Sequence, residues 1–176
     1  LKFNGYQAKY DFQDFNATYS YRPTDNDELT LSAYYGMDNL GVNDSISTVD
    51  IGVRWSNLAT SLSWKHQFSN ACWNTKAHFS GFKNFVDVNE IAMRVNAQSA
   101  LASTGLKSDI EIDISKNMQL ITGFEYNLFF NNPLSFLTDS LNFVNDSISG
   151  LNTLNELSLF VDYKHSVSKY FHYAVG

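Results

Sequence analysis

The sequence has few of the residues that cross-link or interrupt a chain. Its 176 residues include 1 Cys, 2 Pro and 9 Gly. Because Cys72 has no second cysteine to pair with, an internal disulfide is excluded. With so little proline and glycine, the chain is neither a linker nor a low-complexity segment. No apolar run approaches the roughly 18 residues of a membrane-spanning helix, so none is predicted.

Basic residues are also scarce. The chain carries 12 Lys and Arg against 18 Asp and Glu, a net charge of -6. Because no basic stripe is present to neutralise phosphates, we expect no nucleic-acid partner. There is no Ser-His-Asp order, zinc motif or glycine-rich phosphate loop, and none of the histidines has metal-ligand spacing. The sequence therefore predicts no enzymatic activity, no metal and no cofactor; the histidines are His66, His78, His165 and His172.

Aromatic residues, in contrast, are abundant at 15%, which favours extended structure. Apolar and polar side chains alternate through residues 15–22 and 29–36, the pattern of a hairpin with one apolar and one polar side. In residues 106–114, isoleucines alternate with acidic residues, again with the period of a strand. Similar runs predict about eight strands, several near the 9–11 residues that cross a bilayer.

The predicted connections alternate strictly in length. Short polar turns are expected at 22–28, 66–73, 114–118 and 165–170. Three longer segments, expected to be loops, cover 37–57, 82–105 and 131–155. Outer-membrane barrels have short turns at one end and long loops at the other. The sequence therefore predicts an all-β fold, an antiparallel up-and-down transmembrane β-barrel segment.

The apolar side of each strand is expected to face lipid, and the polar side a lumen. Alternation alone does not separate this arrangement from a soluble barrel or sandwich, whose apolar side faces inward. Aromatic residues near strand ends favour a membrane girdle, and the charges on the other side favour a wet lumen. The residues predicted to face lipid are Phe15, Tyr19, Leu29, Leu31, Leu62, Trp64, Ile110, Ile112, Leu120, Phe124, Leu159 and Val161.

Two sets of residues are candidates for contacts beyond the wall itself. The acidic ladder Asp109, Glu111 and Asp113 is expected to face lysine or arginine across the strands rather than a metal. Ligand recognition is expected in the long loops and the upper lumen. The candidate ligand-binding residues, each of which is equally compatible with loop packing or a girdle, are Trp55, Phe82, Phe85 and Phe136.

Several segments resemble one known family. Residues 14–40, DFNATYSYRPTDNDELTLSAYYGMDNL, resemble the barrel of TonB-dependent outer-membrane receptors of the Bacteroidetes type. In that family a strand ends in an Arg-Pro turn, and an aromatic-rich strand ending in Gly-x-Asp follows. Residues 55–70, WSNLATSLSWKHQFSN, resemble the next block, with Ser56 where glycine is common. Residues 124–133 and 156–176 resemble later hairpins, so the likeness covers most of the chain.

The resemblance implies that residues 1–176 are a segment of a 22-stranded barrel in the outer membrane of a Gram-negative cell. No plug domain or TonB box is recognisable, so a fragment is expected. The parent protein would import a scarce nutrient, such as a siderophore, a cobalamin-like cofactor or a glycan. The implied partners are outer-membrane lipid, the rest of the barrel and its plug, the TonB complex through the missing N-terminal region, and a surface lipoprotein.

Two alternatives remain open. A complete eight-stranded barrel acting as an anchor or adhesin would pair its first strand with its last. A soluble β-barrel or sandwich binding module would gather Leu29, Leu62 and Ile112 in a packed interior.

Overall fold

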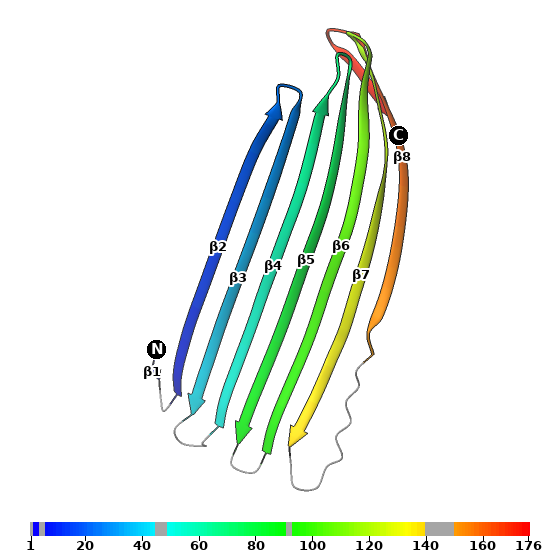
Figure 1. Cartoon of the computed structure of the whole chain (residues 1–176). Helices are drawn as coiled ribbons and strands as arrows, with labels where there is room; N and C mark the ends of the chain where they lie inside the picture. Colours follow the sequence, from blue (N-terminus) through cyan, green and yellow to red (C-terminus); the bar gives the residue numbers. More distant parts are fainter. Residues whose placement is uncertain (1, 4–5, 45–48, 91–92, 140–149) are drawn as a thin grey trace.

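The chain folds into one antiparallel sheet. The computed structural model describes residues 2–3, 6–44, 49–90, 93–139 and 150–176, and this part contains strands and turns but no helix. Neighbours in the sheet are neighbours in the sequence, which is the up-and-down order predicted (Figure 1). The strands are β1 (Lys2–Phe3), β2 (Tyr6–Thr24), β3 (Asp27–Asp44), β4 (Val49–Gln67), β5 (Ala71–Glu90), β6 (Met93–Ser115), β7 (Met118–Asp139), β8 (Asn152–Ser168) and β9 (Phe171–Val175).

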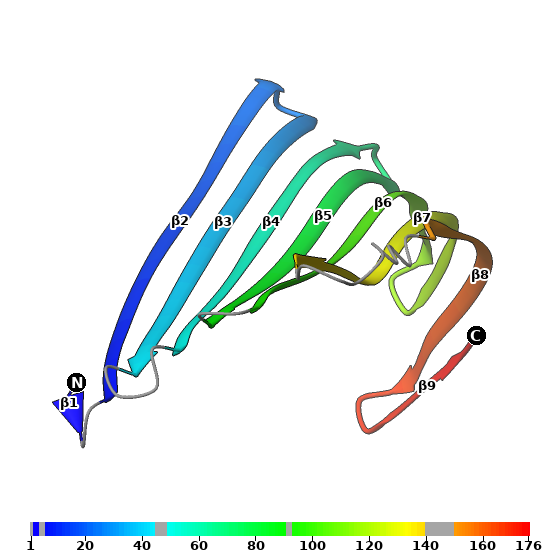
Figure 2. The ribbon, with the colours of Figure 1, turned by 90° about the horizontal axis from the view of Figure 1, so that it is seen from below.

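The sheet is curved and open. Figure 2 shows that it runs from β2 through β5 and bends through β6, β7 and β8. Its outermost strands, β1 and β9, pair only with β2 and β8 respectively, so the described strands do not close into a ring. The pairing of first and last strands expected for a complete eight-stranded barrel is therefore not observed.

The short turns lie where the sequence predicts them, and side chains hold the first one. Pro23 ends the run of regular pairing in β2, because proline has no amide hydrogen to donate to β3. Arg22 then donates to Glu28 Oε2 from Nε at 3.1 Å and from a terminal nitrogen at 2.9 Å. Thr24 Oγ1 donates to Asp27 Oδ2 at 2.5 Å across the turn. The prediction of short turns at this end of the sheet is confirmed for all four hairpins.

The strands are much longer than predicted. From β2 to β8 they have 17 to 23 residues. Most of the residues expected to form three long loops instead continue the strands: β3 extends to Asp44, β5 to Glu90 and β7 to Asp139. The prediction of long loops over 37–57 and 82–105 was wrong. Each of the strands β2 to β8 is roughly twice as long as the 9–11 residues needed to cross a bilayer.

The sheet is a single layer without a packed interior. Ala97, at 9% exposure, is the buried hydrophobic side chain of the described residues, and Leu62 remains 51% exposed. Leu29, Leu62 and Ile112 lie on three different strands of one sheet rather than in a core between two. The described residues therefore lack the interior of a soluble sandwich, and contain no helix long and apolar enough to cross a membrane.

Candidate functional site

The two faces of the sheet differ in chemistry from strand to strand. Residues paired directly across neighbouring strands project from the same face. We name the faces after two consecutive residues of β3, Leu31 and Ser32. The row through Leu31 consists of Tyr19, Leu31, Leu62, Ala77, Leu106, Tyr126 and Leu157. The row through Ser32 consists of Thr18, Ser32, Ser61, His78, Gly105, Asn127 and Glu156.

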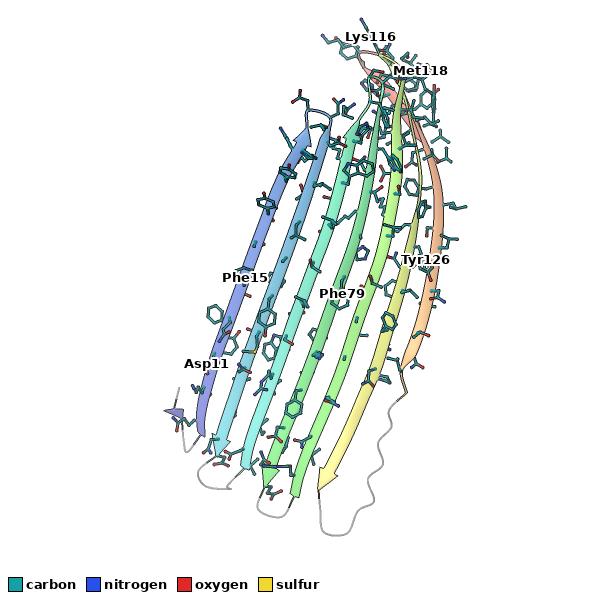
Figure 3. All side chains as sticks on the ribbon, in the orientation of Figure 1. Asp11, Phe15, Phe79, Lys116, Met118 and Tyr126 are labelled. Atoms are coloured by element: carbon teal, nitrogen blue, oxygen red, sulfur yellow. The ribbon has the colours of Figure 1, made fainter. Side chains whose placement is uncertain are left out.

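An apolar band therefore crosses the Leu31 face. In Figure 3, the labelled aromatic residues Phe15, Phe79 and Tyr126 lie at the middle of their strands, with Lys116 and Met118 at the end that carries the short turns. The band is well exposed: Leu31 is 49% exposed and Leu157 66%. Large apolar side chains exposed to this extent over several strands are typical of a surface that contacts another protein or a membrane.

The polarity of both faces reverses toward the opposite end of the strands. Beyond the band, the Leu31 face carries charged and amide residues, among them Asp11, Asn39, Arg54 and Gln98. The Ser32 face there becomes apolar, with rows that contain Leu40, Val53, Val86 and Ala97, and Val42, Ile51, Val88 and Val95. Each successive pair of strands from β2 to β6 keeps a continuous register across this boundary. No bulge in these pairs therefore causes the reversal.

Glycines show which face is the crowded one. A Cβ on Gly123, which lies on the Ser32 face, would be 2.5 Å from the Ser108 carbonyl oxygen and 2.7 Å from Asp109 Cβ. A Cβ on Gly105, on the same face, would collide with the Asn127 side chain. A Cβ on Gly41, on the Leu31 face, would meet no atom within 4 Å. Side chains converge on a concave face, so the Ser32 face is the inner one and the Leu31 face the outer one.

An aromatic cluster marks the turn end of the outer face. The rings of Trp64 and Trp73 are 5.2 Å apart, and those of His66 and Phe68 are 4.4 Å apart. In a second cluster, on β8 and β9, the ring centroids of His165 and Tyr173 are 5.4 Å apart. Trp64, Trp73 and Tyr163 lie next to this end of the apolar band.

Asp27 connects the first turn to this cluster. Trp64 donates from Nε1 to Asp27 Oδ1 at 2.9 Å, and His66 Nδ1 lies 2.7 Å from the same oxygen. Thr24 binds the other carboxylate oxygen. The hydrogen bonds from Thr24, His66 and Trp64 lower the pKa of Asp27 from 3.8 to about 2, because each favours the charged carboxylate. The turn is thus held by a charged acceptor.

The acidic ladder has partners other than those predicted. Asn74 donates to Asp109 Oδ2 at 3.1 Å, and Gln119 donates to Glu111 at 2.6 Å and to Asp113 at 3.1 Å. The expectation of lysine or arginine partners was therefore wrong; amides from β5 and β7 donate to these carboxylates without adding charge. Within the described residues, no group of three or more histidines, cysteines or acids could hold a metal ion.

The candidate ligand-binding residues are not brought together. Trp55 and Phe82 lie on the Ser32 face, as diagonal neighbours on β4 and β5. Phe85 lies on the opposite face, paired with Arg54. Phe136 pairs with Ala97 in the sheet, and its side chain lies outside the described residues. Trp55, Phe82 and Phe85 are in strands rather than loops, and their role in binding stays a prediction.

All the residues predicted to face lipid lie on the outer face. This placement follows from the register, from Phe15 on β2 through Leu62 on β4 to Val161 on β8. That this face meets lipid stays a prediction. The polarity reversal was missed because a simple alternation pattern breaks where its phase changes, between Met37 and Leu40 in β3. A search that allowed one such change in each strand finds it.

Comparisons with known proteins bear on the fold. No family model matches the sequence, and no curated protein matches it. Among solved structures, the ferric yersiniabactin uptake receptor FyuA from Yersinia pestis is similar with a TM-score of 0.62 and 8% sequence identity. The similarity covers 95% of this chain and 27% of that receptor. The chain therefore shares its all-β fold with part of that receptor. At 8% identity the likeness establishes the fold alone.

Proposed function

We propose that this chain forms part of the wall of an outer-membrane transport barrel of the TonB-dependent receptor kind. The observation that carries the proposal is the opposition of the two rows through Leu31 and Ser32. One row is apolar and exposed along its length, whereas its neighbour one residue away is polar. A bilayer outside and water inside explain both rows, since strands of membrane barrels alternate in this way.

The finer identity of the barrel rests on sequence motifs. The Arg22-Pro23 turn and the Gly36-Met37-Asp38 sequence within β3 support a receptor of the Bacteroidetes type. Such a receptor imports a scarce nutrient, and we propose a siderophore, a cobalamin-like cofactor or a glycan as its cargo.

The partners follow from the same proposal. Outer-membrane lipid would cover the apolar band, and further strands of the barrel would cover the open edges of β2 and β8. A plug domain, the TonB complex and a surface lipoprotein would act through parts of the protein other than these strands. In this arrangement the chain forms part of the barrel wall, and other parts of the protein couple transport to energy.

Neighbouring residues on opposite faces of β4 provide the test of the wall. In a Cys72→Ser background, Leu62→Cys and Ser61→Cys are labelled with bimane, and the protein is reconstituted in phosphatidylcholine vesicles that contain doxyl-labelled lipid. The label at residue 62 is expected to be quenched strongly and the label at residue 61 weakly. Equal quenching at the two positions, or quenching at residue 61 alone, would contradict a lipid-facing Leu31 face.

Cargo requires a separate measurement. Cells that lack the gene are expected to take up less of one cargo class than their parent, when ferric siderophores, cobalamin and glycans are supplied in turn. Undiminished uptake of all three classes would remove nutrient import from the proposal and leave the membrane wall standing.

A further inference from the structure

A groove on the outer face crosses the boundary of the apolar band. Its apolar part has a volume of about 440 Å³ and lies over β3 to β7. The floor is formed by small residues, Gly81 and Ala102, which are paired across β5 and β6. Larger side chains border it: Tyr35, Leu58, Phe79 and Phe130. The floor is low because neither residue of the central pair has a side chain larger than a methyl group.

A second groove continues the first beyond the band. It also has a volume of about 440 Å³, and both grooves are lined by Ser56, Lys83, Ala100 and Asn132. Arg54 and Phe85 extend it toward the charged end of the strands. The two together form one elongated depression, apolar where the band lies and polar just outside it.

The polar part carries cations that have no acidic partner among the described residues. Arg54 donates from Nε to Asn39 Oδ1 at 2.8 Å, and Arg54 and Lys83 both line the groove. Ion pairs in the described part of the chain involve Lys9, Arg22 and His66, and neither Arg54 nor Lys83 is within 4.0 Å of a carboxylate there. An exposed lysine and arginine that share one depression attract an anion.

An unsatisfied acceptor lies in the same place. The side-chain oxygen of Asn132 is buried and has no hydrogen-bond partner among the described residues. A buried acceptor without a donor costs free energy, so a ligand hydroxyl or amide that donates to it would be favoured. The depression therefore offers an apolar slot, a cationic pair and an acceptor.

We propose that this groove binds a phosphorylated glycolipid of the outer leaflet. One acyl chain would lie over Gly81 and Ala102, its phosphate would lie between Arg54 and Lys83, and a sugar hydroxyl or acyl amide would donate to Asn132. The apolar slot lies within the band and the cations lie beyond it, which is the order in which a lipid presents its chain and its headgroup. The inference rests on the proposed function, because it requires the Leu31 face to be immersed in a membrane.

Two double variants test the two ends of the groove. Arg54→Ser with Lys83→Ser removes the charges, and Gly81→Leu with Ala102→Leu fills the apolar slot. A Cβ on Gly81 would be 3.6 Å from the Phe79 ring, an ordinary contact, so the backbone at Gly81 accepts the first carbon of a side chain. Lys65→Ser with Lys76→Ser, on the opposite face, removes the same charge and serves as the matched control.

Each protein is reconstituted in phosphatidylethanolamine vesicles containing a minor fraction of lipid A, extracted in mild detergent, and analysed for retained lipid A by mass spectrometry. Each basic residue near an anionic lipid contributes roughly fivefold in affinity, so the charge variant is expected to bind about 25-fold more weakly. The filling variant is also expected to lose retention. The control should retain lipid A like the wild type, and inorganic phosphate should not displace it.

The outcomes separate this inference from the proposed function. If the label at residue 62 is quenched by lipid but all variants retain lipid A equally, the groove is not a lipid site and the membrane wall stands. A loss in the control as large as in the charge variant would show general attraction to anions and overturn the site. Displacement by inorganic phosphate would overturn the lipid assignment. If the label at residue 62 is not quenched, both proposals fail.

Discussion

Asp27 shows how a single residue can fasten two hairpins. It belongs to the first turn, yet its carboxylate accepts hydrogen bonds from Thr24 on one side and Trp64 on the other. These bonds stabilise the ionised carboxylate, so its pKa in the folded protein is about 2 instead of 3.8. Because the pKa is lower in the folded state than in the unfolded state, the free energy of unfolding depends on pH.

Acid titration of unfolding tests this dependence. Because the folded pKa lies below the unfolded one, the stabilisation is fully present above pH 3.8 and is lost as the pH falls toward 2. Asp27→Asn is expected to remove this part of the pH dependence. The measurement is the urea midpoint in vesicles, followed through tryptophan fluorescence. An unchanged slope between pH 3.8 and pH 2 in the variant would show that Asp27 is not the titrating group.

Glycines on the two faces provide a second residue-scale prediction. Gly123→Ala is expected to destabilise the fold by about 1–3 kcal/mol, since its Cβ would press on the backbone carbonyl of Ser108. Gly41→Ala is the control and should be neutral within about 0.5 kcal/mol, because its Cβ meets nothing within 4 Å. Urea unfolding measures both. Equal losses would mean that the inner face is not the crowded one.

At the scale of the element, β2 to β6 each have two segments, and the apolar side chains of the two segments project from opposite faces of the sheet. In β4, Leu58 and Leu62 project outward within the band, and Ile51 and Val53 project inward beyond it. A strand of 19 residues is long enough to cross a bilayer and to continue well past it. The boundary between the segments is expected to coincide with the edge of the hydrocarbon.

Charge placed on either side of that boundary measures its position. Leu62→Arg puts a cation within the band and is expected to cost about 2–4 kcal/mol in a bilayer. Gly52→Arg adds the same residue to the outer face beyond the boundary, where a Cβ has its nearest contact at 3.9 Å, and should cost little. Reversible unfolding from vesicles gives both values. A cost at Gly52 as large as at Leu62 would place the boundary elsewhere.

Much of each strand could be predicted from local pattern. The hairpin turns at 22–28 and 165–170 follow from their polar residues, with Pro23 in the first, and the outward set from Phe15 to Val161 follows from period-two alternation. The halves of the strands that lie beyond the apolar band could not be predicted, because Leu40 and Val42 alternate out of phase with Leu31. The groove could not be predicted either. Its floor at Gly81 and Ala102 is set by cross-strand register, which the sequence does not display.

The whole molecule is an open sheet, and its edges determine how it behaves. β9 pairs with β8 only from Tyr163 to Ser168, so residues 152–162 of β8 have one unpaired side among the described strands. β2 is likewise unpaired on one side beyond its first residues, within the same part of the chain. Unpaired backbone amides are costly in lipid and prone to join other strands in water.

Amide hydrogen exchange reports these edges directly. In the 176-residue chain, amides of β4 and β5 are expected to be strongly protected from exchange. The amides of β2 that point away from β3, at the open edge of the sheet, should exchange quickly. Adding strands that complete the barrel should slow the exchange of β2. Protection of β2 as strong as that of β5 in a monomer would mean that the sheet closes or folds over its own edge.

The phase change in β3 fixes the depth at which this strand would lie in a bilayer. Deleting Asn39 would place Leu40 and Val42 on the same face as Leu31. That face of the strand would then carry one continuous apolar stripe, far longer than the hydrocarbon layer is thick. Such a strand could slide vertically, since no position along the stripe would be preferred. In the proposed membrane arrangement, an offset of a single residue therefore sets how far the strands extend beyond the bilayer.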